Sequence, residues 1–284
     1  MATRKRPVKK KPRLRWLSKY FKHPWALYGV IAVTAVIFIL QHTTQDYRLV
    51  VSPVCGEKIV CPDLAVDRAL NAGGFACQNL PYCWGLKVNQ LIVDGQYWRL
   101  VTPIFIHADL VHIVNNMYVL FLFGQQIKFR YRRFAFLALY MLSGFAGCVI
   151  SFLFAPNPAL GASGAVFGVV GAEVVGHYRQ RDHYGNHQWT SMLIIAAALF
   201  LPGLLRQGVD NWGHLGGLLG GALFAVFAEP GFKLLKRSVK YLQPDWRKTL
   251  LACVAVLAVF GGLAALKIMW VRLGAQAYVL AALA

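Results

Sequence analysis

Residues 134–155 read FAFLALYMLSGFAGCVISFLFA and contain no charged side chain. A transmembrane helix needs about 20 consecutive, predominantly apolar residues to cross the hydrocarbon core of a bilayer. The whole chain has the same character, because 57% of its 284 residues are hydrophobic and only 14% are charged. Soluble domains have about 45–50% and about 25% respectively. The sequence therefore predicts an integral membrane protein.

Six further apolar, charge-poor runs of similar length are spread along the chain. They cover residues 25–41, 110–127, 159–175, 189–205, 212–228 and 250–266. Most connections between them are short, and short connections join antiparallel neighbours in a helical bundle. The sequence therefore predicts an all-α membrane protein with seven spanning helices in one bundle. We expect a basic cytoplasmic tail (1–23), a first helix (24–42), an extracytoplasmic loop (43–109), core helices two to six (110–228), a basic cytoplasmic loop (229–249), and a seventh helix with an external tail (250–284).

The net charge of +19 is concentrated on one side of this arrangement. Residues 1–23 hold ten of the 30 Lys and Arg residues, and the loops that fall on the same side hold most of the others. Cytoplasmic loops carry the excess of Lys and Arg, so we expect a cytoplasmic N-terminus and an external C-terminus in a bacterial inner membrane. The first run is too long for a signal-peptide h-region, so it should remain in the mature chain.

The stretch RKRPVKKKPRLR, residues 4–15, is basic enough to bind nucleic acid. An anchor that contacts anionic lipid is the better interpretation beside a spanning helix. We therefore expect the lipid bilayer as a partner of the basic tail and no nucleic acid.

Four of the six cysteines fall in the extracytoplasmic loop, at Cys55, Cys61, Cys77 and Cys83. An even number of cysteines in an oxidising compartment predicts two disulfides, with three possible connectivities. A zinc site is the alternative, although no CxxC pair is present. The other two, Cys148 and Cys253, lie in spans, where we expect inert packing residues.

The fourth apolar run contains ALGASGAVFG, residues 159–168, with Ser163 among glycines. The ordinary interpretation is helix packing, because glycines at 161, 164, 168 and 171 form a small-residue face. The sixth run contains NWGHLGGLLGG, residues 211–221, with His214 beside a second glycine face. Both residues lie near the same membrane surface, so two closely packed helices would bring hydroxyl and imidazole into hydrogen-bond reach, as a nucleophile and its base require.

The second run begins with HADLVHIVNNM, residues 107–117. His112 and Asn116 are four residues apart, so they lie on one helical face. An imidazole and an amide there can donate hydrogen bonds to a developing oxyanion. Hydrogen bonding between helices is the alternative for this pair.

Four motifs in this order resemble the rhomboid family of intramembrane serine proteases. They are WRLVTPIFIH (98–107), HIVNN (112–116), GASG (161–164) and GHLGG (213–217). The resemblance covers about residues 98–221 and implies a six-helix core, to which the seventh helix is a C-terminal addition. It also implies a dyad of Ser163 as nucleophile and His214 as base, without an aspartate. The oxyanion would be held by the Ser163 backbone N–H, His112 and Asn116.

The resemblance also assigns supporting roles. Trp98 and Arg99 would stabilise a loop that dips into the membrane without crossing it, and the Phe167 ring would stack on His214. Gly161, Gly164 and Gly217 would support the close approach of the helices. The helix and loop over 189–212 would form a mobile gate for the substrate.

Three departures from the family pattern stand out. Gly213 replaces the usual alanine, which should only permit closer packing. Lys128 stands where we would expect a glutamate that pairs inside the cytoplasmic half, so stability there is in question. The cysteine-bearing insert and the seventh helix are additions whose roles the sequence does not assign.

The function predicted is cleavage of single-span or multi-span membrane proteins near the outer membrane face. We expect no cofactor and no metal. A non-catalytic rhomboid relative that binds membrane proteins is the alternative, and such relatives usually lack the serine or the histidine. A transporter or receptor would place more charges deep in its spans, whereas Glu173 is the only acidic residue in the core spans.

Overall fold

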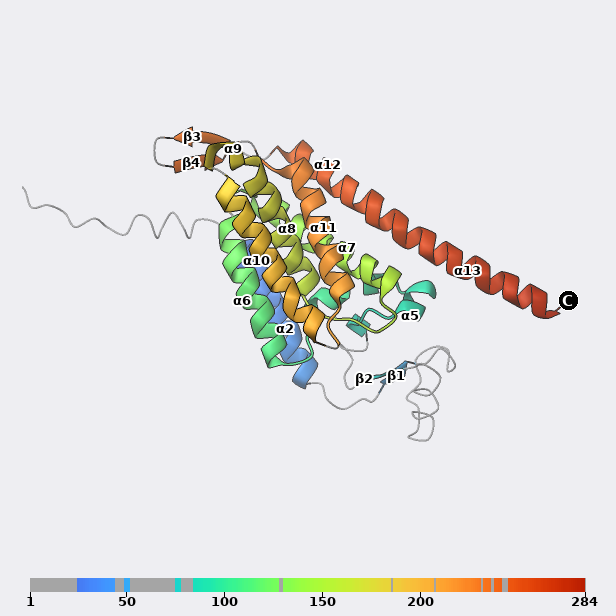
Figure 1. The fold of residues 1–284 in the computed structure, drawn as a ribbon. Coiled ribbons are helices and arrows are strands. Elements are labelled where there is room, and N and C mark those ends of the chain that lie inside the picture. Colours follow the sequence, from blue (N-terminus) through green and yellow to red (C-terminus); the bar gives the residue numbers. More distant parts are fainter. Residues whose placement is uncertain are drawn as a thin grey trace, which may run out of the picture.

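The computed structural model describes residues 25–43, 49–51, 75–77, 84–127, 130–184, 186–206, 208–230, 232–235, 238–241 and 245–283. Each predicted span corresponds to a helix in these ranges. The helices are α2 (Trp25–Thr43), α6 (Leu110–Ile127), α7 (Arg133–Phe154), α8 (Ser163–Arg179), α10 (Asn186–Leu205), α11 (Asn211–Ala228), and α12 (Trp246–Val256) continued through the π-helical turn η3 (Leu257–Gly261) into α13 (Gly262–Leu283). The predicted all-α membrane fold is thus confirmed (Figure 1).

Shorter elements join these helices. Between α2 and α6 lie α5 (Asn89–Val93) and the two 3-10 turns η1 (Tyr97–Leu100) and η2 (Thr102–Phe105), and α9 (Arg181–Tyr184) precedes α10. Two short antiparallel strand pairs lie at opposite ends of the bundle in Figure 1, β1 (Leu49–Val51) with β2 (Phe75–Cys77), and β3 (Phe232–Leu235) with β4 (Ser238–Tyr241).

Five helical segments of the described chain are long and apolar enough to cross a membrane: α2, α6, α7, α10 and the segment Trp246–Gln276. The other two helices of the bundle, α8 and α11, are shorter or richer in glycine. They are 17 and 18 residues long and carry Ser163 and His214. We call the end of the bundle where α6, α8 and α11 begin the serine end, and the opposite end the arginine end.

Helix α11 packs between α7 and α8, and glycine makes the approach possible. A Cβ added at Gly217 or Gly221 would lie 1.9 Å from the carbonyl oxygen of Gly164 or Gly168 on α8. A Cβ added at Gly216, on another face of α11, would lie 2.6 Å from a backbone oxygen of α7. Contacts as short as these exclude any side chain, so the glycines fix the separation of the three helices.

Two helices have bounds that differ from those of their apolar runs. Helix α8 begins at Ser163 instead of residue 159, because Pro156, Pro158 and the positive φ of Gly161 keep the preceding segment out of the helix. The final helix does not end at residue 266 but continues through α13 to Leu283. Lys267 does not interrupt it, because its Nζ donates a hydrogen bond to the Leu153 carbonyl at 3.3 Å.

Exposed tryptophans gather at both ends of the bundle. Trp84, Trp98 and Trp270 are exposed at the serine end, whereas Trp25 and Trp246 are exposed where α2 and α12 begin, at the arginine end. Tryptophan is enriched at both membrane–water interfaces. The two belts therefore bracket the part of the bundle that lies in the hydrocarbon.

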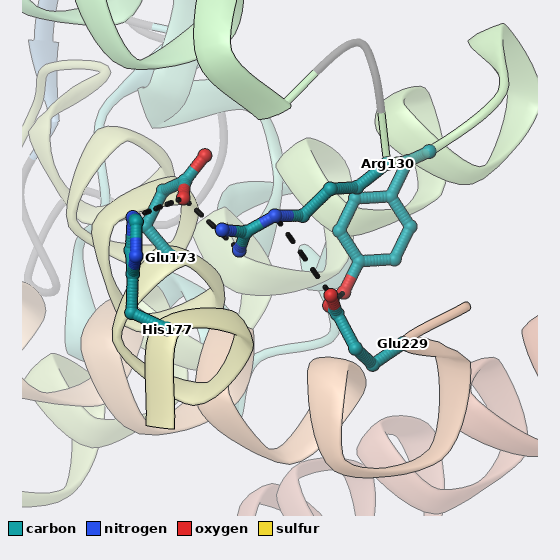
Figure 2. Close-up of polar contacts among 5 residues, drawn as sticks. Arg130, Glu173, His177 and Glu229 are labelled. Atoms are coloured by element: carbon teal, nitrogen blue, oxygen red, sulfur yellow. Dashed lines mark hydrogen bonds and ion pairs between the residues drawn. The ribbon is translucent and has the colours of Figure 1, made fainter. Parts of the chain in front are cut away.

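A buried group of charged side chains, which we call the charged cluster, lies at the arginine end (Figure 2). The Arg130 guanidinium lies between two carboxylates, 3.0 Å from Glu173 and 3.8 Å from Glu229. Tyr131 donates a hydrogen bond to Glu229 at 2.6 Å, and His177 Nε2 is 3.4 Å from Glu173. Burial of Glu229 raises the pKa of its carboxyl group.

The charged cluster lies in the half of the bundle where the family pattern would place a paired glutamate at position 128. Lys128 itself lies outside the described residues. Arg130, Glu173 and Glu229 supply a buried ion-pair network in the same half of the bundle. A Cβ added at Gly176 would lie 1.7 Å from the Arg130 guanidinium, so glycine is needed there for the arginine to enter.

The cysteines divide as the sequence suggests only in part. Cys148 and Cys253 are free thiols, buried and half-buried. Cys55, Cys61 and Cys83 lie outside the described residues, and Cys77 is described only by its place in β2. The two disulfides therefore stay a prediction.

Candidate active site

Ser163 and His214 lie in hydrogen-bond contact at the serine end. Ser163 is the first residue of α8, and His214 lies in the first turn of α11. His214 Nε2 is 2.8 Å from Ser163 Oγ, within the range of about 2.6–3.2 Å that a nucleophile and its base require. The Asp210 side chain caps α11 by accepting a hydrogen bond from the Gly213 N–H at 2.9 Å, which fixes the turn that carries the histidine.

Aromatic rings orient the His214 imidazole. Phe167, one turn after Ser163, stacks on it with ring centroids 4.5 Å apart and an interplanar angle of 24°. Phe200 of α10 meets it edge-on at 6.2 Å. His214 Nδ1 is buried and has no hydrogen-bond partner in the described part of the chain. The ring is thus held by packing, without a carboxylate on its second nitrogen.

His112 and Asn116 converge on the backbone just before Ser163. Gly161 has a φ of +115°, which favours glycine, and a Cβ added there would lie 2.8 Å from His112 Nε2 and 3.8 Å from Asn116 Nδ2. Gly161 therefore lies in the loop before α8 and not on its small-residue face. Asn116 is buried and its Nδ2 has no hydrogen-bond partner among the described residues, whereas Asn115 is exposed. The structure brings together Ser163, His214, His112 and Asn116, and leaves Asn115 out.

His107 also forms a hydrogen bond to the loop before Ser163. Its Nε2 accepts a hydrogen bond from the Ala162 N–H at 3.4 Å, and its ring meets His112 edge-on with centroids 5.0 Å apart. Burial lowers the pKa of His107 to about 4, so the imidazole is neutral at neutral pH and remains an acceptor. The Pro103 carbonyl accepts a second bond from the Gly161 N–H at 2.9 Å.

Gln41 of α2 is a site residue that the sequence analysis missed. It is buried, its Nε2 donates to the His107 carbonyl at 2.6 Å, and its Oε1 lies 3.3 Å from the His107 N–H. The first helix is therefore tied to the loop before Ser163 through His107. A single amide in the last turn of an apolar span was the available signal.

Lys87 is a second missed residue. It is fully buried, and its Nζ donates to the Ala155 carbonyl at 2.9 Å and to Ser151 Oγ at 3.1 Å, at the C-terminal end of α7. Its backbone forms an antiparallel bridge with Ala159. Burial lowers the pKa of Lys87 to about 8. The segment from Ala155 to Ala162, which leads into Ser163, is thus hydrogen-bonded near both of its ends.

Trp98 and Arg99 make hydrogen bonds within the segment between α2 and α6. Arg99 is buried and donates to the Leu86 carbonyl and to Gln96 Oε1, both at 2.8 Å. The Trp98 indole donates to the Trp84 carbonyl at 3.2 Å, and the two indole rings stack. Between residues 84 and 109, all of which the structure describes, the named helical elements are α5, η1 and η2 of five, four and four residues, and none of them is long enough to span a membrane.

Helix α10, the expected gate, makes few buried contacts. Only Met192, Ala196 and Gly203 are buried along it. Its serine end is tied to α11 by one hydrogen bond, from Asn211 Nδ2 to the Gly203 carbonyl at 2.9 Å. In the described ranges no group of three His, Cys, Asp or Glu side chains has the arrangement of a metal site.

Comparison with known proteins supports the resemblance to the rhomboid family. Residues 94–230 match the family model of the Rhomboid domain. The chain is 34% identical over 157 residues to rhomboid protease GluP of Bacillus subtilis, covering 55% of this chain and 31% of that protein. It is 32% identical over 151 residues to rhomboid-like protease 1 of Toxoplasma gondii, covering 50% of this chain and 51% of that protein.

A third relative matches over a greater length. RHOMBOID-like protein 5 of Arabidopsis thaliana is 30% identical over 248 residues, which cover 78% of this chain and 74% of that protein. Against several other relatives, such as GluP, the matched region spans only about a third of the relative. The four motifs of the candidate site all lie within residues 94–230.

Proposed function

The chain belongs to the rhomboid family. From this premise we propose that it is an intramembrane serine endopeptidase. It cleaves transmembrane proteins near the membrane surface at the serine end. The single observation that carries the proposal is the 2.8 Å contact between a partly exposed Ser163 hydroxyl and His214 Nε2. The names of two relatives, rhomboid protease GluP and rhomboid-like protease 1, support a peptidase.

The acylation step uses Ser163 and His214 as one unit. Ser163 Oγ attacks the carbonyl carbon of the scissile peptide bond while its proton passes to His214 Nε2. The tetrahedral intermediate carries an oxyanion, and the imidazolium then protonates the leaving amine as the carbon–nitrogen bond breaks. Water repeats the sequence on the acyl-enzyme, with His214 again as base, and releases Ser163.

The oxyanion is stabilised by donors already in place. The first N–H groups of a helix have no intrahelical acceptor, so the Ser163 N–H is available at the start of α8. The Asn116 amide is buried and unpaired within the described residues, and His112 lies beside Gly161. Preorganised donors of this kind are often the largest single contribution to catalysis.

Substrate helices must unwind before cleavage. In a membrane helix each peptide group is tied into internal hydrogen bonds, so residues that weaken a helix near the serine end should favour cleavage. The few buried contacts of α10 support a role as the gate that admits the substrate. Single-span and multi-span membrane proteins are the substrate class that we propose.

The membrane and its orientation are part of the proposal. The basic tail (1–23), which lies outside the described residues, and the positive-inside rule support an arginine end in the cytoplasm, with the tail on anionic lipid. The names of relatives include chloroplastic and mitochondrial proteins. We propose a bacterial inner membrane with the arginine end in the cytoplasm. A reporter fused to the C-terminus would test this orientation.

The decisive experiment uses the purified full chain and a fluorogenic single-span substrate. Wild type should cleave it, and Ser163→Ala should not. Thr249→Ala is the control, because the Thr249 hydroxyl bonds to the Asp245 carbonyl at the start of α12, at the arginine end, and it should cleave at the wild-type rate. Cleavage by Ser163→Ala at the wild-type rate would overturn the mechanism. Substrate binding without cleavage by wild type would instead support the non-catalytic alternative.

A further inference from the structure

A cavity of about 530 Å³ lies between the final helix and the rest of the bundle. One wall is the face that carries Gly261 and Arg272, and the opposite wall contains Phe145 of α7 with Tyr97 and Leu100 of η1. The volume falls within the roughly 300–1,000 Å³ typical of small-molecule sites. The cavity shares no lining residue with the Ser163 site, so it is a separate feature.

The walls of the cavity suit hydrocarbon. Met269 and Leu273 line it and are 54% and 57% exposed, on a helix that crosses the membrane. Water requires two to four polar partners to occupy a cavity, and most of the lining is apolar. The occupant that these walls favour is therefore a lipid chain from the bilayer.

The polar end of the cavity is formed by Arg272. Its Nε donates to the Val93 carbonyl at 3.0 Å, and its Nη2 reaches the same oxygen and the Tyr97 hydroxyl. Its Nη1 makes no hydrogen bond with any described residue, so a donor remains for an anion. Trp270, 71% exposed two residues earlier, belongs to the aromatic belt of the serine end. Arg272 therefore lies at headgroup level.

The length of the cavity matches one lipid chain. Gly261 and Arg272 are eleven residues apart on a continuous helical segment, a rise of about 16 Å. Half of the roughly 30 Å hydrocarbon core is about 15 Å. An acyl chain whose phosphate lies at Arg272 would therefore end near Gly261, close to the middle of the bilayer.

We propose that this cavity binds one anionic phospholipid from the leaflet at the serine end, with an acyl chain between α13 and α7 and its phosphate on Arg272. The lipid fills the space between the final helix and η1, the segment that carries Trp98 and Arg99. It thereby joins the seventh helix to the six-helix core. This binding is independent of the proposed peptidase chemistry.

The test is native mass spectrometry of the full chain, reconstituted with equal amounts of palmitoyl-oleoyl phosphatidylglycerol and the matching phosphatidylcholine. Wild type should retain one phosphatidylglycerol. Arg272→Gln should lower the preference for phosphatidylglycerol about fivefold, since one cation near an anionic surface contributes roughly 1 kcal/mol. An unchanged preference in Arg272→Gln would overturn the assignment of the phosphate.

Two neighbouring glycines give a matched pair for the acyl chain. A Cβ at Gly261 or Gly262 meets no atom within 4 Å, but only Gly261 lines the cavity. Gly261→Leu should reduce lipid retention about tenfold by displacing roughly two methylene groups, and Gly262→Leu should retain it. Equal retention by both variants would overturn the site. Displacement of the lipid by glycerol 3-phosphate would also overturn it, because the acyl chain would then be unnecessary.

Discussion

The two polar groups of the bundle lie at opposite ends, and both contain buried atoms without a hydrogen bond, such as Glu173 Oε1 in the charged cluster and Asn116 Nδ2 at the serine end. They differ in whether opposite charges compensate each other. In the charged cluster, the carboxylates of Glu173 and Glu229 both face Arg130 (Figure 2). At the serine end, the Asn116 amide and His214 Nδ1 are buried without a hydrogen-bond partner in the described chain. A buried polar group left unpaired costs about 1–3 kcal/mol. The difference separates a group that holds helices together from one that keeps donors available for a reacting molecule.

The largest expected effect is on cleavage, at the serine end. Ser163→Ala and His214→Ala should each lower turnover by at least about 1,000-fold, and the double variant should lose no more than either single one, because the two residues act as one unit. Single-turnover assays with thermal unfolding as a control for folding would check this. Losses that multiply in the double variant would contradict the dyad.

The next effect is on stability, at the arginine end. Arg130→Met should lower the free energy of unfolding by about 3–5 kcal/mol, because it leaves two buried carboxylates without their cation. The turnover of the molecules that stay folded should change little. Denaturant unfolding in detergent, combined with an active-site titration, would separate the two quantities.

Arg132→Met is the matched control for the charged cluster. Arg132 is exposed and precedes α7, so its loss should change the free energy of unfolding by no more than about 0.5 kcal/mol. If Arg130→Met behaves like this control, the charged cluster does not stabilise the bundle.

Two adjacent asparagines test how the oxyanion is held. Asn116→Ala should lower turnover by about 10–1,000-fold, because the Ser163 N–H and His112 remain as donors. Asn115 lies on the exposed face of α6, so Asn115→Ala should keep most of the activity. Both follow from kcat measured on the same substrate. A larger defect in Asn115→Ala would reverse the assignment.

The smallest effect expected is on the pH dependence of stability. The folded state holds the pKa of His107 at about 4, below its usual value of about 6.5. The folded state therefore disfavours the protonated form, so stability is present above about pH 6.5 and is lost as the pH falls towards 4. His107→Gln, which keeps an acceptor for the Ala162 N–H, should flatten this slope in thermal unfolding. Identical slopes in both proteins would rule out His107 as its source.

Much of the fold was predictable because hydrocarbon imposes a simple rule on sequence. Charge-poor runs located all seven helices, but the last run ended before Lys267, whereas its helix continues to Leu283. The sequence could not reveal that the Lys267 ammonium group would find the Leu153 carbonyl. Likewise, the glycine pattern predicted the contact of α8 and α11, but not that Gly161 belongs to a loop with a positive φ.

The site was predicted where its residues fall in motifs and missed where a single polar residue acts through tertiary contacts. Ser163, His214, His112 and Asn116 come together as expected. Gln41 bonds to the His107 carbonyl and Lys87 to the Ala155 carbonyl, each more than 60 residues away, along hydrogen bonds that depend on how distant segments pack. No local pattern encodes such contacts, since most of the partners are backbone carbonyl oxygens.

The glycine contacts of α11 have a consequence for how far a proton travels. Gly217 and Gly221 contact the carbonyl oxygens of Gly164 and Gly168. Because these glycines have no Cβ, α11 and α8 lie close enough for the Ser163 hydroxyl to reach the His214 imidazole. One added carbon would push the two helix axes apart, and a misplacement of about 1 Å in a reacting group can cost about 100-fold in rate. Substitutions at these glycines should therefore lower the rate of the reaction by moving the Ser163 hydroxyl away from the His214 imidazole, although both catalytic residues are still present.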